Sequence, residues 1–388
     1  MRRRLLENQV VMIPRHASEI EISSAENDLL ITRDGRRLID LFCGGGSVFL
    51  GHANASINQC LKDQLEKIWN TGVLKSPART EAGRQIERFF PNHYAFAGLY
   101  STGMEVAEFA MRVARTVTGK KGVAGFERSM HGKSMATSFL GWENELISLP
   151  EIKRLPNIPL TPEDEVLDEL HSVLRSNQIG TVFIEPLLGT AGGHTASPRF
   201  YQQLAGLCSD YGALLVCDEI LTGFYRAGTP FMFSEFGISP EIVLFGKAIG
   251  NGFPVSGIML SKKYSVDAAM LPNSTFAGNP LAAAVVSGTL QVMQDMDMNG
   301  AVSHVQDAIT TNLKAVEDRG ILLQGKGALW VLEFPSDIDT LGVAGALIDE
   351  GVLVSPTGNM IRMLPPATIT ESHLLKACET IRKICLDG

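Results

Sequence analysis

Two charged residues stand at the ends of apolar runs, where a charge is hard to solvate. Asp218 follows the apolar run at residues 213–217, and Lys247 follows the run at 242–245 and one glycine. Burying a carboxylate or an ammonium at such a place costs on the order of several kcal/mol unless the charge is paired. Two interpretations remain open. The two residues form a buried ion pair, or a bound group lies between them and interacts with both.

The second interpretation requires a group with an aldehyde, which forms a Schiff base with Lys247, and a protonated ring nitrogen, which Asp218 holds. Pyridoxal phosphate has both. Its phosphate needs backbone N–H donors at the start of a helix, and residues 101–104 stand directly before a helix predicted from Glu105. Together these features predict a pyridoxal-phosphate site.

Helices and strands alternate around these residues. Helical spacing of apolar residues and short, wholly apolar runs predict helices at 56–69, 105–118, 200–211 and 280–293 and strands at 181–184, 213–217 and 242–245. Such strands form a parallel sheet that is covered on both faces, and ligands gather beyond its carboxyl edge. Glu185, Asp218 and Lys247 each follow a predicted strand, so we expect them to converge at that edge.

The pattern changes near residue 280 to a long helix followed by helices and short strands. We therefore predict an α/β fold with two domains. The large domain, residues 45–280, contains a mostly parallel sheet covered by helices. The smaller α+β domain comprises residues 281–388, and the N-terminal segment 1–44 joins it.

The composition is that of a globular protein. Of 388 residues, 45% are hydrophobic and 20% charged, and 34 Lys and Arg against 42 Asp and Glu give a net charge of −8. This balance does not attract nucleic acid or an anionic membrane. The longest apolar stretch, 242–260, is interrupted by a lysine, a proline and glycines, which is unlike a membrane span.

The cysteines and the N-terminus bear on the compartment. None of the six cysteines has CxxC spacing and four lie in apolar runs, so we interpret them as core thiols. No apolar run follows the basic residues 2–4, so we expect no signal peptide. We predict a cytoplasmic protein without nucleic-acid or membrane partners.

Three other features predict no site. Residues 132–134 end like a phosphate loop, but Glu127 occupies the place of the required first glycine. Glycines 44–46 lack the spacing of a dinucleotide site. Cys and His residues are not paired at ligand spacing, so we predict no metal. We interpret His131 as a structural residue.

Eight segments resemble the class III (subgroup II) pyridoxal-phosphate-dependent aminotransferases, a family that includes the glutamate-1-semialdehyde aminomutase branch. They are residues 40–52, 101–108, 126–132, 185–193, 218–226, 245–254, 274–280 and 361–366. The block from Asp218 to Lys247 is the most specific. The resemblance implies fold type I of the pyridoxal-phosphate-dependent transferases.

The resemblance also implies roles for the central residues. Lys247 would form the Schiff base and move the proton between the substrate carbon and C4′ of the cofactor. Asp218 would keep the ring nitrogen protonated, and Gly103 and Met104 would bind the phosphate through their N–H groups. Thr275 would reach the same phosphate from a second subunit, which implies a homodimer with shared active sites.

The residues implied around the cofactor ring depart from the family in two places. Met130 stands where Tyr or Phe usually stacks on the ring; it makes a softer contact or only fills the core. Ile220 would press on the opposite face. Leu221 replaces a common Gln, and apolar residues there are typical of the aminomutase branch. Glu185 matches the glutamate–proline strand end of the family's cofactor site.

On the substrate side, Arg362 matches an arginine that binds a carboxylate or pairs with a gating Glu. Thr190 occupies the position of that Glu, so the gate is absent. Arg362 either binds a substrate carboxylate permanently or is a structural arginine. Ser47 and Phe49 are expected to line the mouth of the site. The short segment 132–185 suggests that the mouth is open.

Two enzymatic functions follow. The first is an aminotransferase that moves an amino group between an amino donor and an aldehyde or keto acid. The alternative is an aminomutase or another isomerase on the same fold, favoured by Leu221 and by the missing gate. A catalytically silent scaffold is disfavoured because Lys247, Asp218 and Thr275 are all retained.

Overall fold

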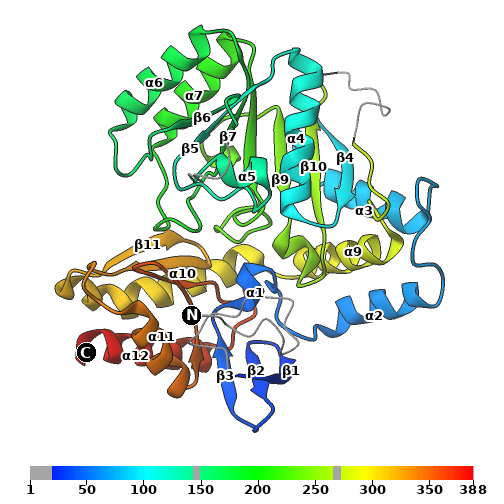
Figure 1. Cartoon of the computed structure of the whole chain (residues 1–388). Coiled ribbons are helices and arrows are strands. Elements are labelled where there is room, and N and C mark those ends of the chain that lie inside the picture. Colours follow the sequence, from blue (N-terminus) through cyan, green and yellow to red (C-terminus); the bar gives the residue numbers. More distant parts are fainter. Residues whose placement is uncertain (1–19, 143–148, 265–271, 388) are drawn as a thin grey trace, which may run out of the picture.

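The computed structural model describes residues 20–142, 149–264 and 272–387. Its largest sheet has seven strands in the order β4-β10-β9-β8-β7-β5-β6 (Figure 1). Strands β6, β5, β7, β8 and β9 are parallel, and β10 runs antiparallel to both of its neighbours. The strands are β4 (Tyr94–Tyr100), β5 (Gly122–Phe126), β6 (Ile152–Leu155), β7 (Ile179–Ile184), β8 (Leu214–Glu219), β9 (Ile242–Phe245) and β10 (Ser256–Ser261).

Both faces of this sheet are buried, as its apolar strands predict. Val216 and Leu244 pack into the cluster that includes α4, whereas Cys217 and Val243 pack into the larger core on the other face. The helices of this part of the chain are α2 (Ala55–Leu65), α3 (Pro77–Glu87), α4 (Gly103–Thr118), α5 (Met135–Phe139), α6 (Glu163–Arg175), α7 (Pro198–Asp210), α8 (Met232–Glu235) and α9 (Pro280–Asp295).

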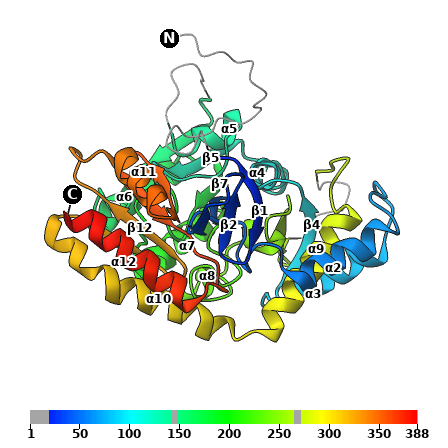
Figure 2. The ribbon, with the colours of Figure 1, turned by 90° about the horizontal axis from the view of Figure 1, so that it is seen from below.

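Residues 22–40 and residues 298–387 together form a second region, seen from below in Figure 2. Strand β3 pairs in parallel with β13, so N-terminal and C-terminal strands share a sheet. One four-stranded sheet contains β1 (Ile22–Glu26), β2 (Leu29–Thr32), β3 (Arg37–Asp40) and β13 (Val352–Leu353), and the other contains β11 (Leu322–Lys326), β12 (Leu329–Glu333), β15 (Met360–Met363) and β14 (Ser355–Thr357). The helices here are α10 (Met298–Leu313), α11 (Thr340–Asp349) and α12 (Glu371–Asp387).

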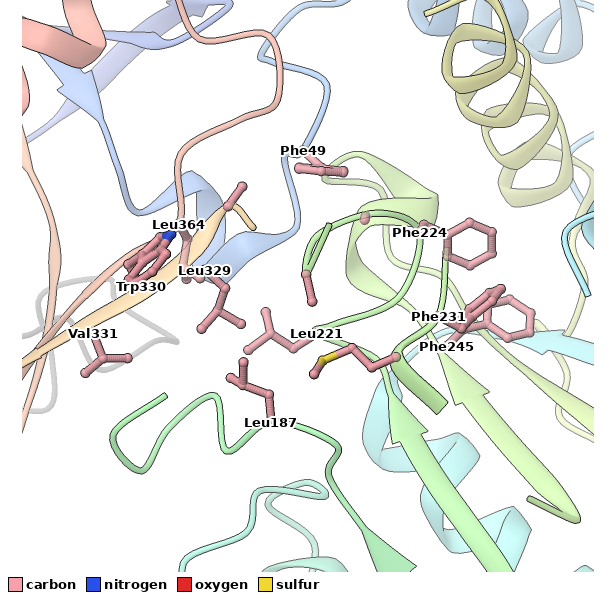
Figure 3. Close-up of a cluster of buried hydrophobic side chains, with 14 of the residues drawn as sticks. Phe49, Leu187, Leu221, Phe224, Phe231, Phe245, Leu329, Trp330, Val331 and Leu364 are labelled. Carbon is pink, nitrogen blue, oxygen red and sulfur yellow. The ribbon is translucent and has the colours of Figure 1, made fainter. Parts of the chain in front are cut away.

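An apolar core joins the two regions. Leu187 and Leu221 follow β7 and β8, and they lie opposite Leu329 and Leu364 of the C-terminal region (Figure 3). Each of these four side chains is at most 6% exposed. The regions are therefore held by continuous hydrophobic packing, which fixes the residues that lie between them.

The four predicted helices and three predicted strands are present; β9 has the predicted ends, and each of the other elements is shifted at one end or both. Asn54 caps α2 by accepting a hydrogen bond from the Ile57 N–H, and Gly119 ends α4 in the left-handed conformation. Helix α2 stops at Leu65 rather than at residue 69. Strand β8 continues through Glu219, so Asp218 lies inside the strand rather than after it.

A left-handed turn, α1 (Cys43–Gly46), replaces regular structure after β3. Its four residues have φ values of 47°, 58°, 72° and 85°. The carboxylate of Asp40 accepts hydrogen bonds from the N–H groups of Phe42 and Cys43, at 2.9 and 2.8 Å, and so fixes the start of the turn. Glycine at three of the four positions avoids most of the strain that side chains would add.

The described residues contain neither a candidate membrane helix nor a candidate metal cluster. None of the helices there combines the length and the apolar character that crossing a bilayer requires. Within the same residues, no group of His, Cys, Asp and Glu side chains is arranged to hold a metal ion. All six cysteines lie in the described part and are free thiols, five of them buried.

Candidate active site

The carboxyl edge of the central sheet opens into a cavity of about 620 Å³. Strand ends from β4, β7, β8 and β9 reach it, together with the left-handed turn α1 and strand β15. Ten of the predicted site residues line it: Ser47, Gly103, Met104, Met130, Glu185, Asp218, Ile220, Leu221, Lys247 and Arg362. The expected convergence at this edge of the sheet is confirmed.

Lys247 begins the short 3₁₀ helix Lys247–Gly250 with a left-handed φ of 43°. Its side chain is partly exposed to the cavity, and it makes no hydrogen bond or ion pair with the described residues. Burial and the nearby charge of Arg362 lower the pKa of Lys247 to about 8, and the opposing effects of Asp218 and Glu185 are smaller. This amine therefore loses its proton more easily than an exposed lysine.

We expect the acylation of Lys247 in the cofactor-free protein to rise with pH around a midpoint of about 8. Only the unprotonated amine reacts, and its fraction increases as the pH passes the pKa. Peptide mass spectrometry after brief acetylation measures this midpoint, with a lysine-containing model peptide, whose pKa is about 10.4, as the reference. An acetylation midpoint near that of the model peptide would contradict the lowered pKa of Lys247.

Asp218 is 4% exposed and has a partner that the sequence did not predict. Its Oδ2 lies 2.8 Å from Nδ1 of His131, and its Oδ1 accepts a hydrogen bond from the Ile220 N–H at 3.1 Å. Nε2 of His131 is buried without a partner among the described residues. A buried N–H without an acceptor is costly, so the proton belongs on Nδ1, which donates to Asp218. His131 is thus a positioning residue of the site.

Glu185 holds the segment after β5 against the cavity. Its Oε2 accepts a hydrogen bond from the Met130 N–H at 2.7 Å. Burial is the main cause that raises the pKa of Glu185, to about 7. Glu185 therefore ties Met130 to the strand end of β7, and Met130 lines the cavity as expected of a residue beside the cofactor ring.

Helix α4 begins at the cavity with free donors. Thr102 caps it by accepting a hydrogen bond from the Glu105 N–H at 3.1 Å. The N–H groups of Gly103 and Met104 have no partner within the described ranges, as expected for the first turn of a helix. A Cβ on Gly103 would lie 2.9 Å from Cδ1 of Ile220, so glycine permits this close approach. The turn can hold a phosphate.

Arg362 on β15 provides a largely buried cation on the opposite side. Its Nη1 donates to the Gly189 carbonyl at 3.3 Å and its Nη2 to Oγ of Ser355 at 3.1 Å. Both acceptors are neutral, and no carboxylate of the described residues lies within ion-pair distance. Thr190, at the position of the missing gate, also lines the cavity. The guanidinium therefore remains available to an anion.

Two predicted site residues do not line the cavity of this chain. Thr275 is exposed before α9, where its carbonyl accepts a hydrogen bond from Nδ2 of Asn70 at 3.1 Å. Phe49 is fully buried, and the guanidinium carbon of Arg226 lies 4.2 Å from its ring centroid. The expectation that Phe49 lines the mouth is wrong, because its ring packs inward instead.

These residues fit pyridoxal phosphate. The cavity offers the amine of Lys247, a carboxylate at Asp218 that a second residue orients, and the N–H groups of Gly103 and Met104; this amine and these N–H groups have no partner in the part of the chain that the structure describes. These three groups can bind the aldehyde, the ring nitrogen and the phosphate of the cofactor, respectively.

Comparisons with known proteins support this conclusion. The family model for class-III aminotransferases matches residues 12–385, so the chain belongs to that family. Acetylornithine aminotransferase of Bacillus subtilis is 27% identical over 94% of both chains. The LysW-aminoadipate semialdehyde/glutamate semialdehyde transaminase of Sulfurisphaera tokodaii is 30% identical, again over 94% of both.

Among solved structures, a transaminase from the marine bacterium Virgibacillus has the same fold. Its TM-score is 0.85 at 22% identity, covering 95% of this chain and 93% of that chain. The chain is thus a class-III aminotransferase with fold type I, and enzymes of this family use pyridoxal 5′-phosphate. The first of the two functions that the sequence predicted is confirmed.

Proposed function

We propose that Lys247 is the catalytic residue of this aminotransferase and that the carboxylate of Asp218 stabilises the charge of the cofactor ring. The cofactor, when bound, supplies an electron sink for the carbanion that forms at the substrate carbon. Lys247 then moves a proton to and from that carbon. Asp218, oriented by His131, holds the proton on the ring nitrogen. Gly103 and Met104 bind the phosphate, while Ile220 and Met130 enclose the ring.

The substrates that we propose are amines and carbonyl compounds that carry a carboxylate. The observation that supports this proposal is Arg362, a partly buried cation at the cavity whose own partners are the neutral Gly189 carbonyl and Ser355 hydroxyl. A substrate carboxylate would supply the missing opposite charge. Without a gating Glu at Thr190, the guanidinium stays available in both halves of the reaction. Ser47 lines the mouth beside this substrate subsite.

The names of the relatives agree with such substrates. A 2-aminoadipate transaminase of Pseudomonas putida is 29% identical over 95% of both chains, and a 5-aminovalerate aminotransferase of Pseudomonas aeruginosa is 28% identical over 99% of this chain and 98% of its own. By their names, both act on amino acids. We therefore propose an amino acid as donor and an aldehyde or keto acid with a carboxylate as acceptor.

Replacing Arg362 with methionine tests the substrate class. We expect the KM for glutamate to rise about 10- to 100-fold, because a charge-assisted hydrogen bond contributes about 1.5–3 kcal/mol. The kcat should change less, since the carboxylate is bound in both ground state and transition state. Arg199→Met is the control, because Arg199 is exposed on α7 and its ion pair among the described residues is with exposed Asp164. An unchanged KM would exclude the carboxylate role.

We further propose that the enzyme is a homodimer. Trp69, Val73, Leu74 and Phe276 are between 62% and 74% exposed, which is unusual for large apolar side chains in a monomer. Asn70 connects their two segments through its bond to the Thr275 carbonyl. Burial of this patch against a second subunit would bring the partner's copy of this loop to the shared site, with its threonine near the phosphate. Sedimentation equilibrium measures the oligomeric state.

The aminomutase alternative keeps one supporting observation. Leu221 lines the cavity in place of a polar residue, as the sequence indicated. The relatives reported above are named as transaminases, and they favour the aminotransferase. The cytoplasmic location expected from the sequence stays a prediction, supported by the buried free thiols.

A further inference from the structure

Arg226 is a fully buried charge outside the cavity. It is 0% exposed, and the described residues place no carboxylate within ion-pair distance of its guanidinium. Desolvation lowers its pKa to about 10, so the side chain remains charged at neutral pH. An uncompensated buried cation is expensive. Its retention therefore calls for a reason other than simple packing.

Three backbone carbonyls from distant segments accept its hydrogen bonds. Nη1 donates to Ala328 at 3.0 Å and to Pro365 at 2.6 Å, and Nη2 donates to Gly46 at 3.0 Å. The ring of Phe49 lies against the guanidinium carbon at 4.2 Å. A planar guanidinium spreads its N–H donors over several nitrogens in fixed directions, whereas a lysine has its three donors on one nitrogen and cannot reproduce this arrangement.

Two of these segments, those of Gly46 and Pro365, carry part of the substrate side of the cavity. Gly46 ends the left-handed turn, whose Gly45 and the following Ser47 line the cavity. Pro365 comes three residues after Arg362 in the chain. Arg226 itself stands five residues after Leu221, on the loop that leaves the cofactor strand β8. The guanidinium therefore connects the cofactor side of the cavity to its substrate side.

We propose that Arg226 is a positioning residue that sets the place of Arg362 and of the left-handed turn relative to Lys247. It touches neither the cavity nor the substrate and acts through Arg362 and the turn. The inference rests on the proposed function, in which Arg362 binds the substrate carboxylate. It goes beyond that function because a buried cation outside the cavity then determines where the substrate-binding residues lie.

The test compares Arg226→Lys and Arg226→Met with the surface control Arg199→Met. For the folded Arg226→Lys holoenzyme we expect the KM for glutamate to rise at least 10-fold, with kcat changed less than about 3-fold and an unchanged cofactor content. The lysine variant keeps a charge at the buried site, so the test remains available if Arg226→Met does not fold. An unchanged KM in Arg226→Lys would overturn the proposal.

A double-mutant cycle with Arg362→Met separates positioning from general destabilisation. If Arg226 acts through Arg362, Arg226→Lys should raise the KM far less in the Arg362→Met background than in the wild type. Equal fold-changes in both backgrounds would show a merely structural role. If Arg362→Met alone leaves the KM unchanged, the carboxylate proposal fails instead, so the two failures are distinguishable.

A second readout needs no substrate. The charge of Arg362 is the largest electrostatic cause that lowers the pKa of Lys247. Displacing Arg362 should therefore move the acetylation midpoint of Lys247 in the cofactor-free protein to higher pH in Arg226→Lys. The Arg199→Met control should keep the wild-type midpoint. A midpoint that stays the same in Arg226→Lys would contradict the proposed positioning.

Discussion

Replacing Lys247 with alanine is expected to lower the rate of transamination by about 10⁴-fold or more. Lys247 is the amine at the centre of the cavity, and positioned proton transfer alone contributes about 10²–10⁴-fold to a rate. Loss of the covalent anchor adds to that effect. Single-turnover measurements with glutamate, in protein saturated with cofactor, give the rate directly.

A chemical rescue distinguishes the loss of a base from a misfolded site. Small primary amines such as methylamine should restore part of the rate in Lys247→Ala, because they enter the vacated space and transfer the proton. The exposed Lys62 on α2 provides a matched control, and Lys62→Ala should keep the wild-type rate. Residual activity above about 1% without an added amine would contradict the assigned role.

The second large effect is expected for Asp218→Asn. An uncharged amide of the same shape cannot stabilise a protonated ring nitrogen, so we expect kcat to fall about 10²–10³-fold. In the variant, the Nδ1–H of His131 can still donate to the amide oxygen, but it cannot donate to the amide nitrogen. The 2.8 Å geometry should therefore persist only in the amide orientation that turns the oxygen toward His131. Cofactor content and kcat should therefore be measured together.

The neighbouring Glu219 gives the matched control for this substitution. Glu219 is also fully buried on β8, but its carboxylate accepts hydrogen bonds from the Thr222 hydroxyl and from the Phe233 N–H, away from the cavity. Glu219→Gln should therefore reduce thermal stability while kcat stays within a few-fold of the wild type. Equal losses of kcat in Asp218→Asn and Glu219→Gln would contradict a specific role of Asp218.

The sequence predicted the cavity well where the chemistry is local. Asp218 and Lys247 stand beside apolar runs of the sequence, and a charge at such a place is itself a signal because burial is costly. The N–H donors of Gly103 and Met104 follow from the start of a helix. These features depend on neighbours in the chain, so spacing and composition reveal them.

Contacts between distant segments were beyond such reasoning. His131 reaches Asp218 across 87 residues, and nothing in its local sequence distinguishes a structural histidine from one that orients a carboxylate. The one available signal was the predicted buried carboxylate of Asp218, because such a group needs a hydrogen-bond donor. Phe49 was misplaced for a similar reason, because its buried partner Arg226 lies far along the chain.

One absorption measurement tests most directly whether this aminotransferase uses a donor that carries a carboxylate. The visible band of the cofactor-loaded enzyme is recorded before and after addition of glutamate, alanine, ornithine and 4-aminobutyrate, one at a time and without any acceptor. We predict that at least one of these carboxylate-bearing amines bleaches the band, that a keto acid restores it, and that an alkylamine without a carboxylate bleaches it far more weakly. A band that none of them changes would contradict the proposed class of substrate.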